Sequence, residues 1–231
     1  CIESTGLVSD LRLLALNSYE NRVYQVGIEG GIPIIAKFYR EGRWSDEQIL
    51  EEHAFSAELV EHDISVVAPQ EINGATLHHA HGQRFSVFER RGGHPPELDN
   101  LDHIYRLGQT LGRIHRIGSA RDFKHRRDIS AQRMATESRL FVQDEFVPIE
   151  LGTAYRTLAA DCDAVATEIL AGMGLEDMQR IHGDCHSGNI LWRDDTAHFV
   201  DLDDCVMGPA IQDVWMFLSG ERHHQERQLS E

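Results

Sequence analysis

Two short segments in the C-terminal half carry the residues best suited to chemistry. The segment IHGDCHSGNILW, residues 181–192, places two histidines, an aspartate and an asparagine in one short loop. The acidic segment FVDLDD, at 199–204, follows it closely. Such a set could bind a metal ion in two ways, through the imidazoles of the histidines or through the oxygen atoms of the carboxylates and the amide.

The zinc alternative depends on His182 and His186, which are four residues apart. This spacing brings two imidazoles together on a helix. Gly183 and Gly188 disfavour a regular helix here, however, and no third soft ligand stands nearby. The pattern therefore does not favour zinc.

The oxygen atoms suit Mg²⁺ better. Mg²⁺ prefers one or two carboxylates, with phosphate oxygens and water completing its coordination. Asn189 and Asp201 could converge on such an ion, which leaves Asp184 free to orient an attacking hydroxyl and accept its proton. Phosphoryl transfer requires this division of labour, because it needs an aligned nucleophile and cations that neutralise charge on the phosphate.

Phosphoryl transfer also needs a lysine near the phosphates, itself held by a carboxylate. Lys37 is the single charged residue of the apolar segment IPIIAKFY at 32–39. A buried lysine requires an anionic partner. The helix expected next in the chain offers Glu51 and Glu52.

The first 90 residues are predicted to form strands and one helix. Ser45 and Gln48 make a capping box that begins a helix over about 45–61. The β-forming residues predict strands at 11–16, 22–28 and 32–39, and a hairpin formed by ATLHHA and RFSVFE. Together these give a five-stranded antiparallel sheet with one helix.

Beyond residue 90 the pattern changes. RGGHPPE, at 91–97, has the glycine and proline residues of a linker. Apolar residues then recur at helical spacing, and the expected elements are helices at 98–118, 150–171 and 210–219 and a short hairpin formed by ILWRD and AHFVDLD. The sequence thus predicts an α+β protein with an N-terminal lobe at 1–90, a hinge at 91–97 and a mostly helical C-terminal lobe at 98–231. Because it starts without methionine and ends in a polar tail directly after an apolar helix, we expect the chain to be incomplete, its C-terminal lobe above all.

Charge and cysteine content limit the classes of partner. The chain has 22 Lys and Arg against 38 Asp and Glu, a net charge of −16, which argues against non-specific nucleic-acid binding. No apolar run approaches the ~20 residues of a membrane span. Four cysteines without a CxxC pair indicate a reducing, cytoplasmic setting. For a complete protein we expect a monomer.

The motifs together resemble the aminoglycoside phosphotransferase and choline kinase superfamily. HGDCHSGN followed by FVDLDD, with Lys37 in a third strand and a glutamate in the next helix, carries the resemblance. That superfamily has a protein-kinase-like bilobal fold whose catalytic loop reads HGDxxxxN. The resemblance extends from about residue 11 to 220 and is to the bacterial Ser/Thr protein kinases of this superfamily in particular. The further segments that carry it are LNSYENRVYQV, AKFYREGRWS, QILEEHAF and VDLDDCVMGPAIQDVWMFLSG.

The resemblance implies roles for the acidic and amide residues. Asp184 is then the catalytic base. Asn189 and Asp201 are the Mg²⁺ ligands, and Asp201 takes the part of the aspartate in the DFG motif of protein kinases. Asp203 is a further metal contact.

The resemblance also implies an ATP site in the N-terminal lobe. Lys37 would pair with the ATP phosphates and be held by Glu52, with Glu51 as the alternative. The turn at 17–21 would cover the phosphates through backbone N–H groups and the Ser18 hydroxyl, in place of a glycine-rich loop. Glu89, within 87–90, lies where backbone groups of a hinge would meet the adenine.

Other polar residues near these motifs are expected to support them. Asp213 and His182 are predicted to brace the loop that contains the HGD motif of residues 182–184, the HGD loop. Cys185 and Cys205 flank the aspartates in sequence. A redox switch is one interpretation of these cysteines. The favoured interpretation is that they are small apolar side chains packed beside the site. The basic run RDFKHRR, at 121–127, is expected to be a solvated loop, with docking of an acidic substrate segment as the alternative.

The predicted function is transfer of the ATP γ-phosphate to a hydroxyl, with Mg²⁺ as the metal and Ser or Thr of a protein as the acceptor. A kinase of small molecules (aminoglycoside, choline-like or sugar alcohol) is the first alternative. A nucleotide-binding pseudokinase is the second, against which stands the presence of Lys37, Asp184, Asn189 and Asp201.

Overall fold

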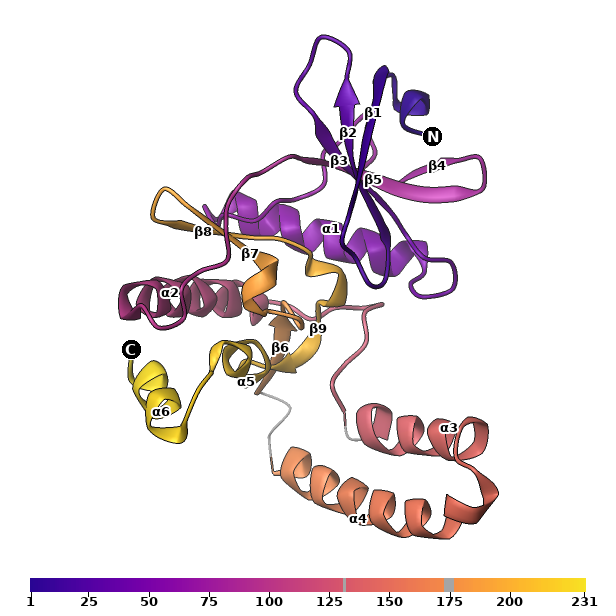
Figure 1. The fold of residues 1–231 in the computed structure, drawn as a ribbon, viewed down its shortest axis with the longest axis vertical. Coiled ribbons are helices and arrows are strands. Elements are labelled where there is room, and N and C mark those ends of the chain that lie inside the picture. Colours follow the sequence, from indigo (N-terminus) through magenta and orange to yellow (C-terminus); the bar gives the residue numbers. More distant parts are fainter. Residues whose placement is uncertain (131, 173–176) are drawn as a thin grey trace.

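A computed structural model describes residues 1–130, 132–172 and 177–231. Its N-terminal part is a five-stranded antiparallel sheet in the order β1-β2-β3-β5-β4 (Figure 1). The strands are β1 (Ser9–Leu16), β2 (Arg22–Ile28), β3 (Ile34–Phe38), β4 (His78–Ala80) and β5 (Gln83–Glu89). The predicted sheet is confirmed, although β4 is shorter than the ATLHHA segment predicted for it.

The alternation of side chains in β3 separates an apolar face of the sheet from a polar one. Ile34 and Ala36 pack with Val26, Phe85 and Val87 in a small core on one face. Lys37 pairs with Val23 on β2 and with Ser86 on β5. Because side chains alternate along a strand, Lys37 points to the opposite face, toward the rest of the molecule.

Helix α1 (Asp46–Glu61) lies between this sheet and the C-terminal part (Figure 1). It begins with the predicted capping box, in which the Ser45 hydroxyl accepts from the Gln48 N–H and the Gln48 side chain accepts from the Ser45 N–H. Phe55 and Leu59 of α1 belong to the main core, together with residues of the C-terminal part. The helix of the predicted N-terminal lobe therefore shares its apolar face with the second half of the chain, and the lobe boundary at 91–97 stays a prediction.

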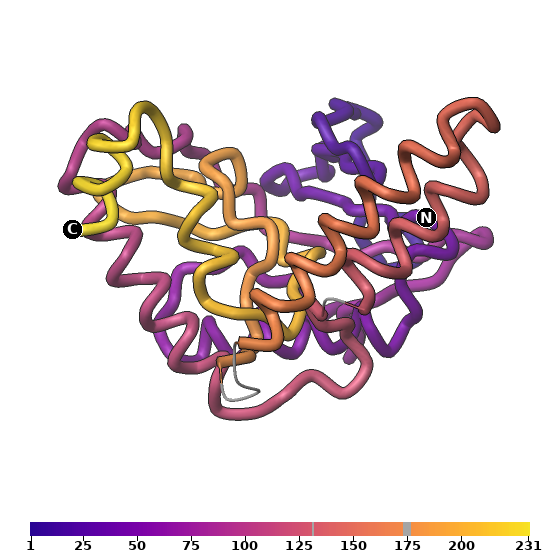
Figure 2. Tube along the Cα trace, turned by 90° about the horizontal axis from the view of Figure 1, so that it is seen from below, coloured from indigo at the N-terminus to yellow at the C-terminus, as the bar shows by residue number. Residues whose placement is uncertain are grey.

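The C-terminal part combines helices with two short strand pairs. Its helices are α2 (Leu101–Gly118), α3 (Ser138–Glu145), α4 (Gly152–Ala171), α5 (Ile211–Val214) and α6 (Arg222–Ser230). Strands β6 (Met178–Ile181) and β9 (Val206–Pro209) pair antiparallel, as do β7 (Ile190–Arg193) and β8 (Thr196–Phe199). Helices α3 and α4 form a hairpin that projects from this body (Figures 1 and 2). No helix in the described part of the chain is long and apolar enough to cross a membrane.

Some C-terminal elements differ from the prediction. The helix expected at 210–219 consists of α5 and a 3-10 turn, Trp215–Phe217, after which Leu218 adopts an extended conformation. The change from α-helical to i→i+3 bonding tightens the chain there. Helix α3, helix α6 and the β6–β9 pair had no counterpart in the prediction. Strands this short contain too few residues for a recognisable alternation.

The shared core makes a direct prediction for α1. Phe55 is fully buried and meets Phe123 edge-to-face with 5.5 Å between ring centroids. Phe55→Ala should lower the free energy of unfolding by about 3–5 kcal/mol, because it leaves a cavity at the junction of α1 and the C-terminal part. Denaturant unfolding measures this loss. Leu50→Ala is the control on the same helix, since Leu50 is 45% exposed, and an equal loss in both variants would contradict the shared core.

Candidate active site

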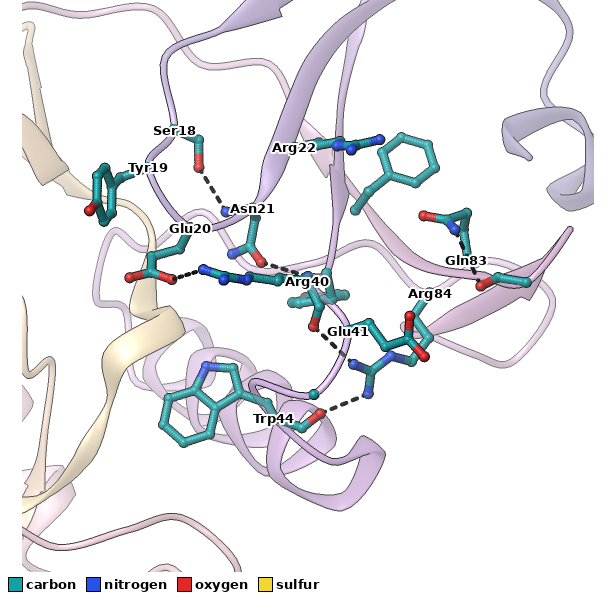
Figure 3. A pocket seen from close by; sticks show the side chains of 14 residues that line it. Ser18, Tyr19, Glu20, Asn21, Arg22, Arg40, Glu41, Trp44, Gln83 and Arg84 are labelled. Atoms are coloured by element: carbon teal, nitrogen blue, oxygen red, sulfur yellow. Dashed lines mark hydrogen bonds and ion pairs between the residues drawn. The ribbon is translucent and has the colours of Figure 1, made fainter. Parts of the chain in front are cut away.

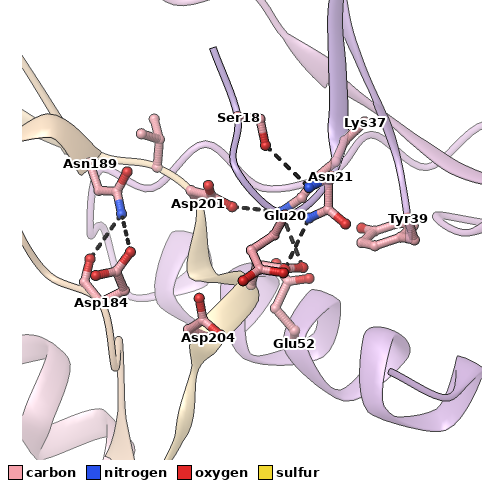
Figure 4. A network of polar contacts seen from close by, with 12 residues as sticks. Ser18, Glu20, Asn21, Lys37, Tyr39, Glu52, Asp184, Asn189, Asp201 and Asp204 are labelled. Carbon is pink, nitrogen blue, oxygen red and sulfur yellow. Dashed lines mark hydrogen bonds and ion pairs between the residues drawn. The ribbon is translucent and has the colours of Figure 1, made fainter. Parts of the chain in front are cut away.

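The two strand pairs bring the HGD loop and the FVDLDD segment together. Strand β6 ends directly before His182 and β9 begins directly after Cys205, while β7 and β8 pair on the other side of the site. Asn189 Nδ2 donates to the backbone carbonyl of Asp184 at 2.9 Å and to its carboxylate at 3.2 Å (Figure 4). The predicted base and the predicted amide ligand are therefore in direct contact.

Two hollows meet at these loops. A cleft of about 400 Å³ is lined by Ser18, Lys37, Glu52, Glu89, Asn189 and Asp201, among others. A groove of about 550 Å³ is lined by Asp184 and Asp204 together with Trp44, Arg127 and Phe141. Except for the buried Asp203, the residues predicted for nucleotide and metal binding thus face one space, and the predicted base faces another.

Lys37 is buried and pairs with the acidic segment rather than with helix α1. Its Nζ lies 2.6 Å from Asp201 Oδ1 and 3.3 Å from Asp203 Oδ1 (Figure 4). Among the described residues no ion pair joins Lys37 to Glu52, the partner expected from the sequence. Glu51, the alternative, accepts three backbone N–H groups of residues 124–126 and does not face the cleft.

Burial explains why Glu52 does not compete for the lysine. Glu52 is 2% exposed, and loss of solvent raises the pKa of its carboxyl to about 7, against an opposing effect of the Lys37 charge. Within the described part of the chain its Oε2 has no hydrogen-bond donor. A carboxyl that ionises with difficulty is a weaker partner for an ammonium than the carboxylates of Asp201 and Asp203.

Asp203 joins the acidic segment to the N-terminal sheet and its loops. It is 3% exposed, and its Oδ2 accepts from Asn21 Nδ2 and from Arg43 Nη1, both at 3.0 Å. Burial alone would raise the pKa of Asp203, but the charges of Lys37 and Arg43 outweigh it and hold that pKa below its ordinary value. Arg43 also pairs with Asp204 and Glu20. Sequence reasoning missed Arg43, since an arginine in a polar loop carries no distinguishing pattern.

The HGD loop and the acidic segment approach each other at backbone distance. Gly183 has a φ of +85°, and a Cβ at that position would lie 2.1 Å from the carbonyl oxygen of Asp204. Asp201 also has a left-handed conformation, with φ of 59°, although it is not a glycine. Strained backbone of this kind persists where the surroundings enforce it, and it is frequent at functional sites.

The predicted bracing of the HGD loop has the expected contacts. The fully buried Asp213 accepts from the backbone N–H groups of His182 and Gly183 at 3.0 and 2.9 Å. His115 Nε2 bonds to the same carboxylate at 2.9 Å. His182 Nε2 contacts the carbonyl of Val200, directly before Asp201, at 3.0 Å. His115 was missed from the sequence, although a histidine beside Ile114 on the apolar face of α2 was a signal.

The remaining predicted nucleotide contacts lie at the rim of the cleft. The Ser18 hydroxyl accepts from the Asn21 N–H at 3.3 Å, which closes the turn between β1 and β2. Glu89 is half-exposed at the end of β5, where its carboxylate pairs with Arg91 at 3.2 Å. The prediction concerned backbone groups at the end of β5 rather than this carboxylate, and the end of β5 borders the cleft.

The cysteines and the loop histidines do not form a site of their own. Cys185 and Cys205 are fully buried, and burial raises the pKa of both thiols, which disfavours the reactive thiolate. The redox-switch interpretation is not supported. His186 Nδ1 accepts from the Gly188 N–H within its own turn. Among residues 1–130, 132–172 and 177–231, no cluster of three or more His, Cys, Asp or Glu is arranged to hold a metal ion.

The close approach at Gly183 predicts a severe effect of a small substitution. Gly183→Ala should separate the two loops, because its Cβ cannot share space with the Asp204 carbonyl and the backbone is left-handed. Thermal unfolding and nucleotide binding would both report the change. Gly92→Ala is the control, since a Cβ there meets no atom within 4 Å; a Gly183 variant as stable and as competent in binding as the control would contradict the contact.

The raised pKa of Glu52 predicts a pH dependence of stability. Its carboxyl keeps its proton up to about pH 7 in the folded state but loses it near its ordinary value of 4.5 when unfolded. Between these values the folded state binds more protons, so the Glu52 contribution to stability falls as pH rises. The unfolding free energy of Glu52→Gln minus that of the wild type should therefore increase from pH 4.5 to 7, by up to about 3 kcal/mol.

Denaturant unfolding of both proteins across this pH range measures the difference. Glu61→Gln, at an exposed position of the same helix, is the control and should give a constant difference. A constant difference for Glu52→Gln as well would mean that Glu52 ionises normally in the folded protein.

Known proteins are similar to this chain in both sequence and fold. The sequence model of the phosphotransferase enzyme family matches residues 12–231. Stress response kinase A of Escherichia coli O157:H7 is 44% identical over 225 residues, which cover 97% of this chain and 68% of that protein. Serine/threonine protein kinase RdoA of Salmonella typhimurium is 42% identical over 227 residues, again 97% of this chain and 68% of that protein.

Solved structures extend the likeness of the fold to lower sequence identity. Amicoumacin kinase hAmiN, in complex with AMP-PNP, Ca²⁺ and Ami, superimposes with a TM-score of 0.78 at 22% identity, over 99% of this chain and 74% of that one. A microcompartment-associated aminopropanol kinase gives a TM-score of 0.75 at 22% identity, over 96% and 75% of the two chains. These two show the fold alone, whereas the family model and the kinases at 42–44% identity match nearly the whole sequence. The chain therefore belongs to the phosphotransferase enzyme family and has its kinase-like α+β fold.

Proposed function

We propose that the protein transfers the γ-phosphate of ATP, with Mg²⁺, to a Ser or Thr hydroxyl of a protein substrate in a stress response. One observation carries the proposal. Lys37, Asn189 and Asp201 line one cleft, while Asp184, in contact with Asn189, opens onto a separate groove. A phosphate donor in the cleft and a hydroxyl acceptor in the groove could then meet beside Asp184, which would orient the hydroxyl for in-line attack on the phosphorus, opposite the leaving oxygen of ADP.

The cleft suits a nucleotide in shape and chemistry. Apolar side chains of Val23, Ile35 and Leu191 line it together with the polar groups of Lys37 and Ser18. An adenine would lie near the end of β5, where Glu89 is, and the phosphates would face Lys37. This is the arrangement of nucleotide pockets in general: mostly apolar walls with a few polar groups that fix orientation.

The acidic residues fit a divalent cation. The ammonium of Lys37 already lies between the carboxylates of Asp201 and Asp203, so these groups accept a cation at this position. Apart from this ion pair with Lys37, Asp203 Oδ1 accepts no hydrogen bond among the described residues. Asn189 directs its Nδ2 to Asp184, which leaves its Oδ1 for a metal. When bound, Mg²⁺ would neutralise charge on the phosphates, and two carboxylates with one amide meet its preference for oxygen ligands.

Binding of the metal would also change the partners of Lys37. With Asp201 and Asp203 engaged by Mg²⁺, the lysine is free to pair with phosphate oxygens. Glu52 is then the remaining buried carboxyl near it, which is the role inferred for Glu52 from the sequence. A second ionic partner would stabilise the ionised form of Glu52 and lower its pKa.

Asp184 is the proposed base. It is partly exposed at the mouth of the groove, with its Oδ2 3.6 Å from His186 Nε2. The choice of a protein acceptor is supported by the relatives at 42–44% identity, which are named as stress response and serine/threonine protein kinases. The proposed setting is the cytoplasm, where ATP is present and where the four free cysteine thiols stay reduced.

The alternative acceptor is a small molecule. Proteins with this fold include an amicoumacin kinase and an aminopropanol kinase. The groove favours this alternative in one respect, because Trp44, Met134 and Phe141 give it an apolar wall beside the carboxylates of Asp184 and Asp204. Such a wall suits a cationic amine as well as a peptide side chain.

The proposal predicts the effect of removing the base. Asp184→Asn should lower the rate of phosphate transfer from Mg-ATP by about 10²–10⁴-fold, since the amide cannot accept the proton of the hydroxyl. Nucleotide binding should be retained, because Asp184 does not line the cleft. Transfer of γ-labelled phosphate to a generic basic protein and to a panel of small alcohols, side by side, measures the rate. Asp194→Asn, at an exposed turn, is the control.

Label on protein that disappears in Asp184→Asn would support the Ser/Thr kinase. Label only on a small molecule would move the function to the alternative acceptor. Nucleotide binding without any transfer by the wild type would contradict catalysis and identify a pseudokinase.

A further inference from the structure

The basic run at 121–127 is part of the interior and not only a solvated loop. Arg121 is exposed and pairs with Glu58 at 2.7 Å. Arg126, by contrast, is 6% exposed. A buried guanidinium loses much of its hydration, so partners for its donors contribute strongly to its stability. Nε and Nη1 of Arg126 have such partners, whereas Nη2 has none among the described residues.

Arg126 reaches the acidic segment through the backbone. Its Nη1 donates to the carbonyl of Asp203 and, at 3.4 Å, to that of Cys205. Its Nε donates to the carbonyl of Gln48 in α1 at 2.7 Å. In the described part of the chain Arg126 has no carboxylate within ion-pair distance. Its hydrogen bonds therefore determine the position of backbone groups, in addition to placing a positive charge near Asp203 and Glu52.

The guanidinium of Arg126 lies over the aromatic ring of Trp44. The Arg126 Cζ lies 4.3 Å from the ring centroid. Trp44 is itself held, because its carbonyl accepts from Arg84 at 2.8 Å, at the edge of a hollow outside the cleft (Figure 3). The preceding residue, Arg43, binds the side chains of Asp203 and Asp204. Arg43 thus holds the acidic segment by its carboxylates, and Arg126 holds it by its carbonyls.

The backbone that carries Arg126 is fixed to α1. The Glu51 carboxylate accepts the N–H groups of Lys124, His125 and Arg126 at 2.5–2.8 Å, and Gln48 Nε2 donates to the His125 carbonyl at 2.9 Å. Displacement of Arg126 would therefore require displacement of α1. Through Arg126 the acidic segment is thus connected to a helix whose Phe55 and Leu59 belong to the main core.

We propose that Arg126 is a positioning residue for the metal site. By holding the carbonyls of Asp203 and Cys205 against α1, it keeps the turn that follows Asp201 in the form that directs the Asp201 and Asp203 carboxylates at one cation. The proposal rests on the proposed function only for the identity of the cation site. Arg126 itself does not line the cleft.

Metal binding tests the proposal without any need for phosphate transfer. Mn²⁺, measured by electron paramagnetic resonance in the presence of a non-hydrolysable ATP analogue, serves as the probe. Arg126→Met should weaken Mn²⁺ binding about tenfold or more, since it removes three charge-assisted hydrogen bonds. Arg126→Lys keeps the charge but not the planar fork, so it should show a smaller loss. Affinity for the nucleotide analogue without metal should stay within about twofold, because Arg126 does not line the cleft.

Arg121→Met is the matched control, as it removes a charge from the same run at an exposed position. Equal Mn²⁺ affinity in wild type, Arg126→Met and Arg126→Lys would overturn the proposal, and so would an equal loss in the Arg121 control. A parallel loss of metal-free nucleotide affinity would overturn it as well, because it would show general disruption. If Arg126→Met does not fold, the Mn²⁺ affinity of Arg126→Lys relative to the wild type decides between these outcomes. Absence of transfer by a wild type that binds Mn²⁺ normally would contradict the proposed function and leave this inference standing.

Discussion

The site depends on the neutralisation of buried negative charge. Asp203 and Glu52 are almost fully buried, and Asp201 and Asp204 lie beside them. Carboxylates so close together repel one another in a medium of low dielectric constant and cannot all ionise without cations nearby. Lys37, Arg43 and Arg126 supply the cations, from a strand, a loop and the segment after α2. The contact between the N-terminal sheet and the acidic segment is thus largely electrostatic.

The same interaction explains the state of Lys37. It is the counter-ion of Asp201 and Asp203, at 2.6 and 3.3 Å. The residue proposed to bind phosphate and the residues proposed to bind Mg²⁺ therefore lie in ionic contact with one another. Under the proposed function, binding of Mg-ATP would exchange these ionic partners.

The sequence predicted the long and patterned elements well. The five-stranded sheet, the capped helix α1 and the positions of Asp184, Asn189 and Asp201 in two adjacent loops follow from periodicity, turn residues and motif spacing. It could not predict contacts between residues distant along the chain. Arg43, His115 and Arg126 are ordinary polar residues in local terms, and their importance appears only when folding places them against Asp203, Asp213 and the backbone of the acidic segment. The partner of Lys37 could not be read from the sequence either, because it depends on the relative burial of three carboxyl groups.

The attachment of α1 has a consequence for how the cleft can open. Three N–H bonds to Glu51, the Gln48 contacts and the apolar face at Phe55 and Leu59 hold this helix to the second half of the molecule. Rotation of α1 would break all of them together, so it is a poor hinge. The turn between β1 and β2 is held differently, because Glu20 pairs with Arg40 and Arg43 and Asn21 donates to Asp203, while Tyr19 at its tip is 97% exposed. The side of the cleft where Glu52 of α1 lies is therefore fixed to the second half of the molecule.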